Sequence, residues 1–262
     1  MMPVKFSIVT PSFNQAGFIE RTLNSVQGQQ ADFGVEHIVI DGGSTDGTLE
    51  ILEKYSGRIR YFSGPDRGMA DALNKGFGMA SGNIIGWLNS DDLYLPGTLQ
   101  KTAEYFEQHP GCLWLYGNCR IIDEDDHEIR RWITAYKNRL ARNFSYERLL
   151  VENFISQPAV FMRREALEAA GQVDTTLPTA MDYDLWLRLA KLGKPGYLSD
   201  DLACFRVHKG SISARSYRAQ FAEQYSIHLR YDRRLKYRLL HRMHVMKTIG
   251  SYWMLNQAGK LF

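Results

Sequence analysis

The chain has 262 residues, enough for one large α/β domain with a sizeable core or for such a domain with an extension. Its formal net charge is only +3, which excludes a molecule that binds polyanions over its whole surface, so the positive excess must be local. Three cysteines without a CxxC pair favour a reducing compartment over a disulfide framework. No run resembles a signal peptide or a membrane-spanning segment, and we therefore expect a cytoplasmic protein.

Strands and helices alternate along the chain up to about residue 117. The expected strands lie at 6–10, 35–40, 58–62 and 83–88, and the expected helices at 17–29, 48–56 and 69–81. This alternation predicts an α/β fold with a mostly parallel central sheet flanked by helices. Loop-forming polar residues follow each strand, and open parallel sheets bind ligands at this edge.

The second part of the chain is less regular. From about residue 118 we expect a hairpin around 123–128, helices at 146–152 and 182–193, and a strand at 158–164. These elements complete the sheet and shape an acceptor pocket. After about residue 214 the sequence becomes helical and basic, so we divide the chain into a main domain, 1–213, and a helical extension, 214–262.

Two adjacent aspartates, Asp91 and Asp92, follow the strand expected at 83–88. Neighbouring ionised carboxylates repel one another and lose hydration when buried, so they need a cation or hydrogen-bond donors. A hard cation such as Mg²⁺ or Mn²⁺ takes oxygen ligands and shares them with a bound phosphate. The alternative is that one aspartate caps the helix expected near Pro96 or shapes a turn, and both interpretations stay open.

Further polar side chains follow the second and third strands. Asp41 stands directly after the second strand, before two glycines that allow close approach of a ligand, and it could accept hydrogen bonds from a nucleobase or ribose. Asp66 and Arg67 follow the third strand and offer an acceptor and a guanidinium that could reach a phosphate. Ordinary turns would explain both segments as well.

Asp182 and His208 lie in the second half of the chain. Asp182 opens a helix, where it is either a cap or a general base that accepts a hydroxyl proton. His208 follows a strand that could close on a metal site, although a lone histidine is more often structural.

Seven motifs in order make the chain resemble the family 2 glycosyltransferases, nucleotide-sugar-dependent enzymes of the GT-A fold, especially the bacterial ones that build polysaccharides. The resemblance runs from about Phe6 to Ser213. The motifs are IVTPSFNQ (8–15), IVIDGGSTDGT (38–48), PDRGMADALNKGF (65–77), GNIIGWLNSDD (82–92), QPAVFMRREAL (157–167), MDYDLWLRL (181–189) and FRVHKGSIS (205–213).

The resemblance implies a role for each candidate residue. The implied nucleotide-binding residues are Thr10, Pro11, Ser12, Asp41, Asp66, Arg67 and Asp91. Asp92 is implied to bind the metal, Mg²⁺ or Mn²⁺, through the family's DXD-type site, with His208 as a further ligand. Asp182 is the implied base, in a position where the family usually has Glu-Asp and this chain has Met181-Asp182.

The implied activity is an inverting, metal-dependent transfer of a sugar from a nucleotide diphosphate donor to a saccharide or lipid-linked acceptor, in cell-surface polysaccharide synthesis. Two alternatives remain. A sugar nucleotidyltransferase would need a glycine-rich, basic phosphate loop after the first strand, and residues 11–17 read PSFNQAG instead. A noncatalytic protein that binds a nucleotide sugar or glycan would keep the pocket without turnover.

The extension is strongly basic between Arg230 and Lys247, where apolar residues are interleaved and Asp232 is the single acid. Such a helix could lie on an anionic membrane surface, which would make the protein peripheral on the inner face of the cell membrane. The alternative is a helix packed on the main domain with a solvated basic face. No nucleic acid partner is expected, because no reading module accompanies the basic stretch.

Overall fold

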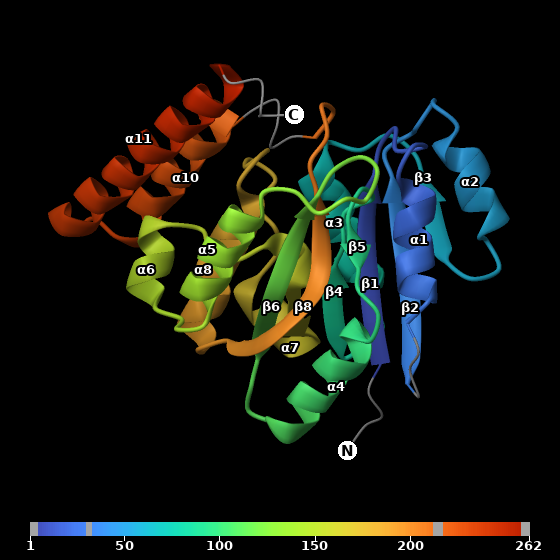
Figure 1. Cartoon of the computed structure of the whole chain (residues 1–262). Coiled ribbons are helices and arrows are strands. Elements are labelled where there is room, and N and C mark those ends of the chain that lie inside the picture. Colours follow the sequence, from blue (N-terminus) through green and yellow to red (C-terminus); the bar gives the residue numbers. More distant parts are fainter. Residues whose placement is uncertain (1–4, 30–32, 212–216, 258–262) are drawn as a thin grey trace.

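The computed structural model describes residues 5–29, 33–211 and 217–257. It contains an eight-stranded sheet in the order β3-β2-β1-β4-β7-β6-β8-β5 (Figure 1). The strands are β1 (Lys5–Ser12), β2 (Gly34–Asp41), β3 (Arg60–Ser63), β4 (Ile84–Trp87), β5 (Leu93–Tyr94), β6 (Trp114–Ile122), β7 (Val160–Arg163) and β8 (Gly196–Arg206). The helices are α1 (Ile19–Gln27), α2 (Thr48–Lys54), α3 (Met69–Met79), α4 (Thr98–Gln108), α5 (Arg131–Ala141), α6 (Tyr146–Val151), α7 (Arg164–Ala170), α8 (Met181–Leu192), α10 (Tyr217–Tyr231) and α11 (Leu235–Gln257), with a 3₁₀ turn, η1, at Gln157–Ala159.

The first four strands are parallel, as the alternating sequence predicts. β1 pairs with β2 on one side and β4 on the other, and β2 pairs with β3. β1 is buried over nearly its whole length because helices cover both faces of the sheet. The chain runs outward through β2 and β3 and then returns to β4. This reversal beside β1 opens a crevice at the carboxyl ends of β1 and β4.

The second half of the sheet is mixed. β7 is antiparallel to both β4 and β6, β8 is parallel to β6, and β5 is antiparallel to β8. The expected hairpin around residues 123–128 follows β6 and is closed by a bridge between Ile122 and Glu128. The expectation of a mostly parallel sheet therefore holds for the first half, while the α/β class holds throughout.

Helices cover the sheet on both faces. α3, α7 and α8 contribute to the apolar core on one face, and α1 and α4 contribute to the core on the other. α3 lies especially close to the sheet at Gly76, where a Cβ would be 2.4 Å from Cγ1 of Val9. The three-layer arrangement fixes the loops that follow β1 and β4.

The C-terminal helices α10 and α11 pack on α6 and α8 (Figure 1). Ile227 of α10 is fully buried, and the Nδ1 atoms of His228 and His241 both contact the carbonyl of Leu150 at 3.0 Å. The boundary that we expected at residues 213 and 214 lies outside the described residues. Among the helices of the described part, none is long and apolar enough to cross a membrane.

Candidate functional site

A cavity of about 990 Å³ lies at the carboxyl ends of β1 and β4. Pro11 and Ser12 at the end of β1 form part of its wall, and Trp87 and Asp91 contribute from β4 and the loop after it. The second half of the chain closes the cavity with the start of α8, the loop after β8 and Gln220 of α10. Segments far apart in the sequence therefore meet where the strand order reverses.

The charged side chains of the cavity wall are mainly acidic. Asp66, Asp91 and Asp182 line it, together with His208, and no lysine or arginine does so within the described ranges. A ligand with a diphosphate would experience repulsion from these carboxylates. A cation bound beside it would offset this repulsion.

Asp91 and His208 form a pair at the cavity wall. The Nε2 of His208 lies 3.0 Å from Oδ2 of Asp91, and the two side chains are only 8% and 17% exposed, respectively. The ring of Phe18 packs on the imidazole at 4.5 Å between centroids, and Nδ1 accepts the backbone N–H of Gly210. Because Nδ1 accepts a hydrogen bond, Nε2 carries the proton that faces Asp91 in this arrangement. Carboxylate oxygen and imidazole nitrogen are both ligand types of divalent ions, and His208 could act as one only after its ring gives up this proton.

The pair could supply at most two protein ligands, and no cluster of three or more His, Cys, Asp or Glu that could hold a metal occurs in the described part of the chain. Mg²⁺ usually takes one or two carboxylates, with water and substrate phosphates completing its shell. The site therefore fits a metal ion that is held jointly with a phosphate ligand, and does not fit one held by protein side chains alone.

Asp92, the residue expected to bind the metal, does not line the cavity. Its side chain is fully buried; Oδ1 accepts the backbone N–H of Arg206 at 2.8 Å, and Oδ2 lies 3.3 Å from the amide of Asn89. Burial and the neighbouring Asp91 raise the pKa of Asp92 well above its ordinary value. The two adjacent aspartates thus point to different environments, and only Asp91 reaches the cavity.

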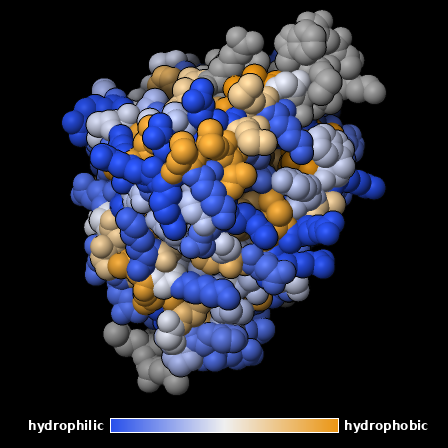
Figure 2. All heavy atoms as spheres, turned by 90° about the vertical axis from the view of Figure 1, so that its left-hand side faces the viewer, coloured by the Kyte–Doolittle hydropathy of each residue, from blue (hydrophilic) through white to orange (hydrophobic). Residues whose placement is uncertain are grey.

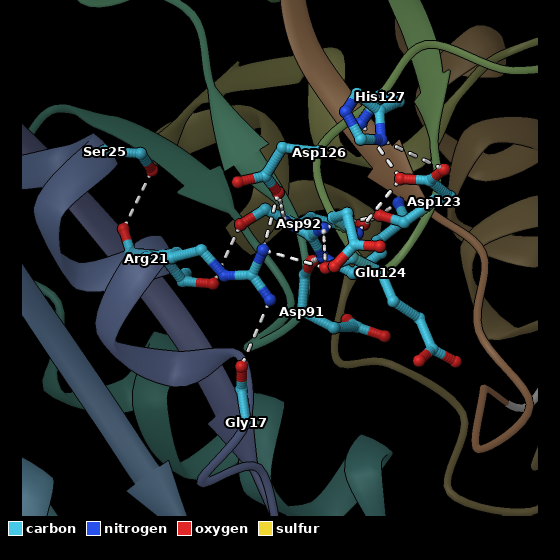
Figure 3. Close-up of polar contacts among 12 residues, drawn as sticks. Gly17, Arg21, Ser25, Asp91, Asp92, Asp123, Glu124, Asp126 and His127 are labelled. Atoms are coloured by element: carbon cyan, nitrogen blue, oxygen red, sulfur yellow. Dashed lines mark hydrogen bonds and ion pairs between the residues drawn. The ribbon is translucent and has the colours of Figure 1, made fainter.

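Arg206 fixes the loop that carries these aspartates, and Arg21 fixes the acidic turn after β6. Arg206 is buried, donates to the carbonyls of Asp91 and Asp123 at 2.7 and 2.6 Å, and pairs with Asp126. Arg21 reaches from α1 to Asp126 at 3.0 Å and to the carbonyl of Glu124 at 2.8 Å (Figure 3). The acidic turn after β6 therefore carries Asp126, which pairs with both guanidinium groups, and one of these, that of Arg206, holds the Asp91 backbone in place.

The residues expected around the nucleotide are divided between the cavity and its support. Pro11 and Ser12 line the cavity, and the buried hydroxyl of Ser12 has no hydrogen-bond partner in the described structure. Thr10 is buried in the sheet, with its hydroxyl 2.9 Å from Nε2 of His37. An unpartnered buried hydroxyl at a cavity wall is a candidate contact for a ligand.

Asp41 supports the turn after β2 and does not line the cavity. It is 1% exposed, and its carboxylate accepts the N–H groups of Gly43 and Ser44 and the hydroxyls of Ser44 and Ser63, at 2.5–3.0 Å. Four donors satisfy this carboxylate inside the protein. The turn interpretation therefore describes its contacts better than direct contact with a base does.

Asp66 lines the cavity and Arg67 does not. Asp66 packs against Gly42, where a Cβ would lie 2.9 Å from Oδ2, so the absence of a side chain at position 42 makes room for it. The Arg67 side chain is 80% exposed and pairs with Asp71 at 3.1 Å. Of these two expected residues, the acceptor faces the ligand space and the guanidinium faces solvent.

Asp182 lies at the start of α8 with its side chain in the cavity wall. Burial raises the pKa of this carboxyl, while the nearby Lys137 ammonium and the amide of Asn153, at 3.3 Å, lower it. Met181, which precedes it, is 4% exposed and also lines the cavity. The net effect is a raised pKa, and a partly desolvated carboxylate of this kind is suited to accept a proton.

Sequence reasoning missed two amides at the bottom of the site. Asn89 accepts a hydrogen bond from the Trp87 indole at 2.8 Å and donates to Gln157 at 3.0 Å, and Gln157 donates to the carbonyl of Trp87. Both amides line the cavity. Asn89 lies in the motif GNIIGWLNSDD and Gln157 in the motif QPAVFMRREAL, so these two motifs were the signal that could have identified them.

The model of the family described as Glycosyl transferase family 2 matches residues 7–171. The chain is 29% identical over 252 residues to the putative teichuronic acid biosynthesis glycosyltransferase TuaG of Bacillus subtilis, a match that covers 94% of this chain and 92% of that protein. It is also 29% identical over 196 residues to the chondroitin synthase of Pasteurella multocida. That match covers 74% of this chain and only 20% of the synthase.

Solved structures of low sequence identity share the fold. The mannosyltransferase PcManGT from Pyrobaculum calidifontis, in complex with GDP-Man and Mn²⁺, has a TM-score of 0.67 at 19% identity, covering 100% of this chain and 76% of that one. S. aureus TarS 1–349 in complex with UDP-GlcNAc has a TM-score of 0.64 at 18% identity, covering 96% and 73%. The α/β architecture is therefore the GT-A fold.

Proposed function

Because the chain belongs to glycosyl transferase family 2, we propose that its cavity binds a nucleotide-diphospho-sugar and transfers the sugar with inversion at the anomeric carbon. The observation that carries this proposal is the composition of the cavity wall: Asp91 paired with His208 on one part of it, and Asp182 on another. The first pair suits the diphosphate end of a donor. The Asp182 carboxylate suits an incoming alcohol.

For the donor, we assign the nucleoside to the wall formed after β1 and β3. Ser12 and Asp66 offer polar contacts there, and Phe13, which is 59% exposed at the cavity, offers a face on which a base can stack. Thr10 and Asp41 support this wall from within the fold. Arg67 would contact the donor only after leaving its ion pair with Asp71.

For the metal, we propose Mg²⁺ or Mn²⁺ held by Asp91 and His208. When bound, the ion would neutralise the negative charge that develops on the departing diphosphate. Asp92 then has a supporting role, because its carboxyl holds the backbone of Arg206. The solved mannosyltransferase with GDP-Man and Mn²⁺ has the same fold and is consistent with this assignment.

For the chemical step, Asp182 is the proposed general base. The acceptor oxygen forms a bond to C1 of the sugar, its proton moves to the Asp182 carboxylate, and the bond from C1 to the diphosphate oxygen breaks. The nucleoside diphosphate leaves with the electron pair of that bond. General-base catalysis of this kind typically contributes about 10²–10⁴ in rate.

For the acceptor, we propose a saccharide or a lipid-linked saccharide in cell-surface polysaccharide synthesis. This proposal follows from the relatives, of which one is named for teichuronic acid biosynthesis and another as a chondroitin synthase. We further propose that residues 1–213 form the transferase domain and that the C-terminal helices contact the membrane that carries such acceptors.

A donor panel tests the proposed function. The full chain is incubated with UDP-, GDP- and dTDP-sugars and Mn²⁺ or Mg²⁺, and release of nucleoside diphosphate is measured with and without acceptor saccharides. We expect one donor class to be turned over, with a requirement for the divalent ion. Pyrophosphate release from a nucleoside triphosphate and a sugar phosphate would favour a nucleotidyltransferase instead, and donor binding without any turnover would favour a noncatalytic protein.

A further inference from the structure

Helix α11 packs on the domain with one side and exposes apolar residues on the other. His241 on its inner side is 1% exposed, whereas Leu235, Leu239, Met243 and Met246 are 65%, 51%, 66% and 72% exposed. These four residues follow one another at intervals of four, four and three positions, so they form one stripe along the outer side of the helix. An apolar stripe along a helix normally faces another apolar surface, so its exposure here needs a reason.

The stripe is the main apolar feature of the described surface. Five of the ten exposed large hydrophobic side chains of the described residues belong to α11, with Leu240 as the fifth. Figure 2 views the molecule from the left-hand side of Figure 1, where α10 and α11 lie. It shows apolar side chains gathered on the upper part of this side, with hydrophilic ones around them. A single exposed leucine needs no explanation. A continuous row of exposed apolar side chains indicates a surface that binds a membrane or another protein.

Basic residues border the stripe. Arg233 precedes it, and Lys236 and Arg242 lie on its two sides; all three are exposed. Asp232, the nearest acid in the sequence, is 8% exposed and pairs with Arg234 at 2.5 Å, and Glu152 lies 3.6 Å from His244, on the side of α11 opposite the stripe. No aspartate or glutamate occurs from position 233 to 257. The border of the stripe is therefore positively charged.

This charge pattern decides between the possible occupants. A second copy of the chain would bring the same arginines and lysines together around the two stripes, which costs free energy. Nucleic acid would neutralise the border and leave the leucines and methionines in water. An anionic lipid bilayer satisfies both parts, because headgroups pair with the basic border while the stripe enters the acyl boundary.

We propose that the outer stripe of α11 docks on an anionic lipid bilayer, with the helix lying in the plane of the surface. A second feature agrees with this orientation. An apolar groove of about 450 Å³ between α10 and α11 is lined by Phe221, Tyr225, Val245 and Ile249, and it shares Met246 with the stripe and Arg242 with the basic border. Lipid chains could therefore pack beside the stripe as well as on it.

Docking would also orient the cavity. Gln220 of α10 lines the cavity, and Glu223, one turn later, binds the segment before α8. The pair of helices α10 and α11, which would contact the membrane, therefore also forms part of the cavity wall near Asp182, where we place the acceptor. Membrane binding itself needs no substrate, so it can be tested separately from sugar transfer.

Vesicle flotation of the full chain tests the inference, with phosphatidylcholine vesicles that contain or lack phosphatidylglycerol, at low and high salt. We expect binding only to the anionic vesicles, weakened by salt. Lys236→Gln/Arg242→Gln should weaken it roughly thirtyfold, since each basic residue near the surface is worth about 1 kcal/mol. Leu239→Ser/Met243→Ser should weaken it by about tenfold or more because the inserted apolar area is lost.

Matched controls carry the same changes elsewhere. Lys54→Gln/Lys194→Gln removes two exposed lysines, and Phe62→Ser/Leu192→Ser removes two exposed apolar side chains away from α11; both should float as the wild type does. Nucleotide release from the donor without vesicles should be unchanged in the stripe variant, which separates membrane binding from catalysis.

Three results would overturn the proposal. These are a wild-type chain that does not float with anionic vesicles, a stripe variant that floats as well as the wild type, and a dimer in analytical ultracentrifugation that the stripe variant abolishes. The last result would assign the stripe to a second copy of the chain.

Discussion

At the residue scale, the main feature of the site is that two adjacent aspartates have different surroundings. Asp91 faces the cavity beside His208, while Asp92 is buried under the backbone of Arg206. The two carboxylates therefore do not face a common metal site. One residue offers charge to a ligand, and the other holds the loop in position.

Substituting each aspartate by asparagine separates these roles. We expect Asp91→Asn to weaken Mn²⁺ binding in the presence of nucleoside diphosphate by about tenfold or more, because a charged ligand is lost. Asp92→Asn should keep most of the binding, since this carboxyl does not reach the cavity. Calorimetric titration of Mn²⁺ into both variants measures the difference. Equal losses in the two variants would contradict the assignment.

The pH dependence of turnover tests the surroundings of Asp182. Burial raises the pKa of this carboxyl and Lys137 lowers it, and the base must be ionised to accept a proton. Lys137→Gln should therefore move the acid limb of kcat/KM to higher pH. Arg139→Gln, which removes an exposed cation from the same helix α5, is the control and should leave the limb in place. A limb that stays or moves to lower pH in Lys137→Gln would refute the electrostatic account.

The sequence could point to candidate polar residues, and could not predict partners that come from distant segments. Asp182 and His208 are recognisable as polar residues that open a helix and follow a strand, but the pairing of His208 with Asp91 is not. Asp41 looks equally accessible in the sequence, but one of its donors, Ser63, comes from the neighbouring strand. Likewise, the choice between Asp91 and Asp92 depends on Arg206, more than a hundred positions later.

At the scale of elements, the contact between α3 and the sheet controls the cavity wall, because α3 begins directly after the Asp66 loop. A Cβ at Gly76 would be 2.4 Å from Val9 and 3.3 Å from Ile40, whereas a Cβ at Gly78 would meet nothing within 4 Å. Two glycines of one helix thus face opposite environments.

This difference gives a stability prediction with an internal control. Gly76→Ala should lower the free energy of unfolding by about 1–3 kcal/mol through overpacking. Gly78→Ala should raise it by up to about 1 kcal/mol, because alanine is the better helix former. Urea unfolding monitored by circular dichroism measures both. A Gly76 variant as stable as the wild type would show that α3 can move away from the sheet without cost.

The elements of the first half were predictable because strands and helices alternate there with clear loop residues between them. β6 and its neighbours were less so. β6 contains Gly117 and Arg120, and its register with β8 shifts on both sides of Asn118. A strand interrupted in this way lacks the regular alternation from which strands are predicted.

At the scale of the whole molecule, the C-terminal helices are coupled to the side of the cavity that carries Asp182. The Glu223 carboxylate of α10 accepts the N–H groups of Thr179 and Ala180 at 2.8 and 2.5 Å and the Thr179 hydroxyl at 2.8 Å. These residues immediately precede the helix that carries Asp182. A negative charge at this helix start also interacts favourably with the helix dipole.

Removing this contact should lower turnover without removing a group that touches substrate. We expect Glu223→Ala to reduce kcat by roughly tenfold to a hundredfold, because small displacements of a catalytic group are costly. The donor Kd should change little, and Glu223→Gln should restore much of the rate since its amide oxygen can accept the same hydrogen bonds. A Glu223→Ala variant with wild-type kcat, at unchanged thermal stability, would show that α10 does not position the base.

The central claim is that one cavity binds the donor and presents Asp182 to the acceptor. The most direct measurement compares wild type and Asp182→Asn for donor binding by calorimetry and for kcat by nucleotide release. We predict an unchanged Kd and a kcat lower by about 10²–10⁴. Near-normal turnover in Asp182→Asn would contradict the account.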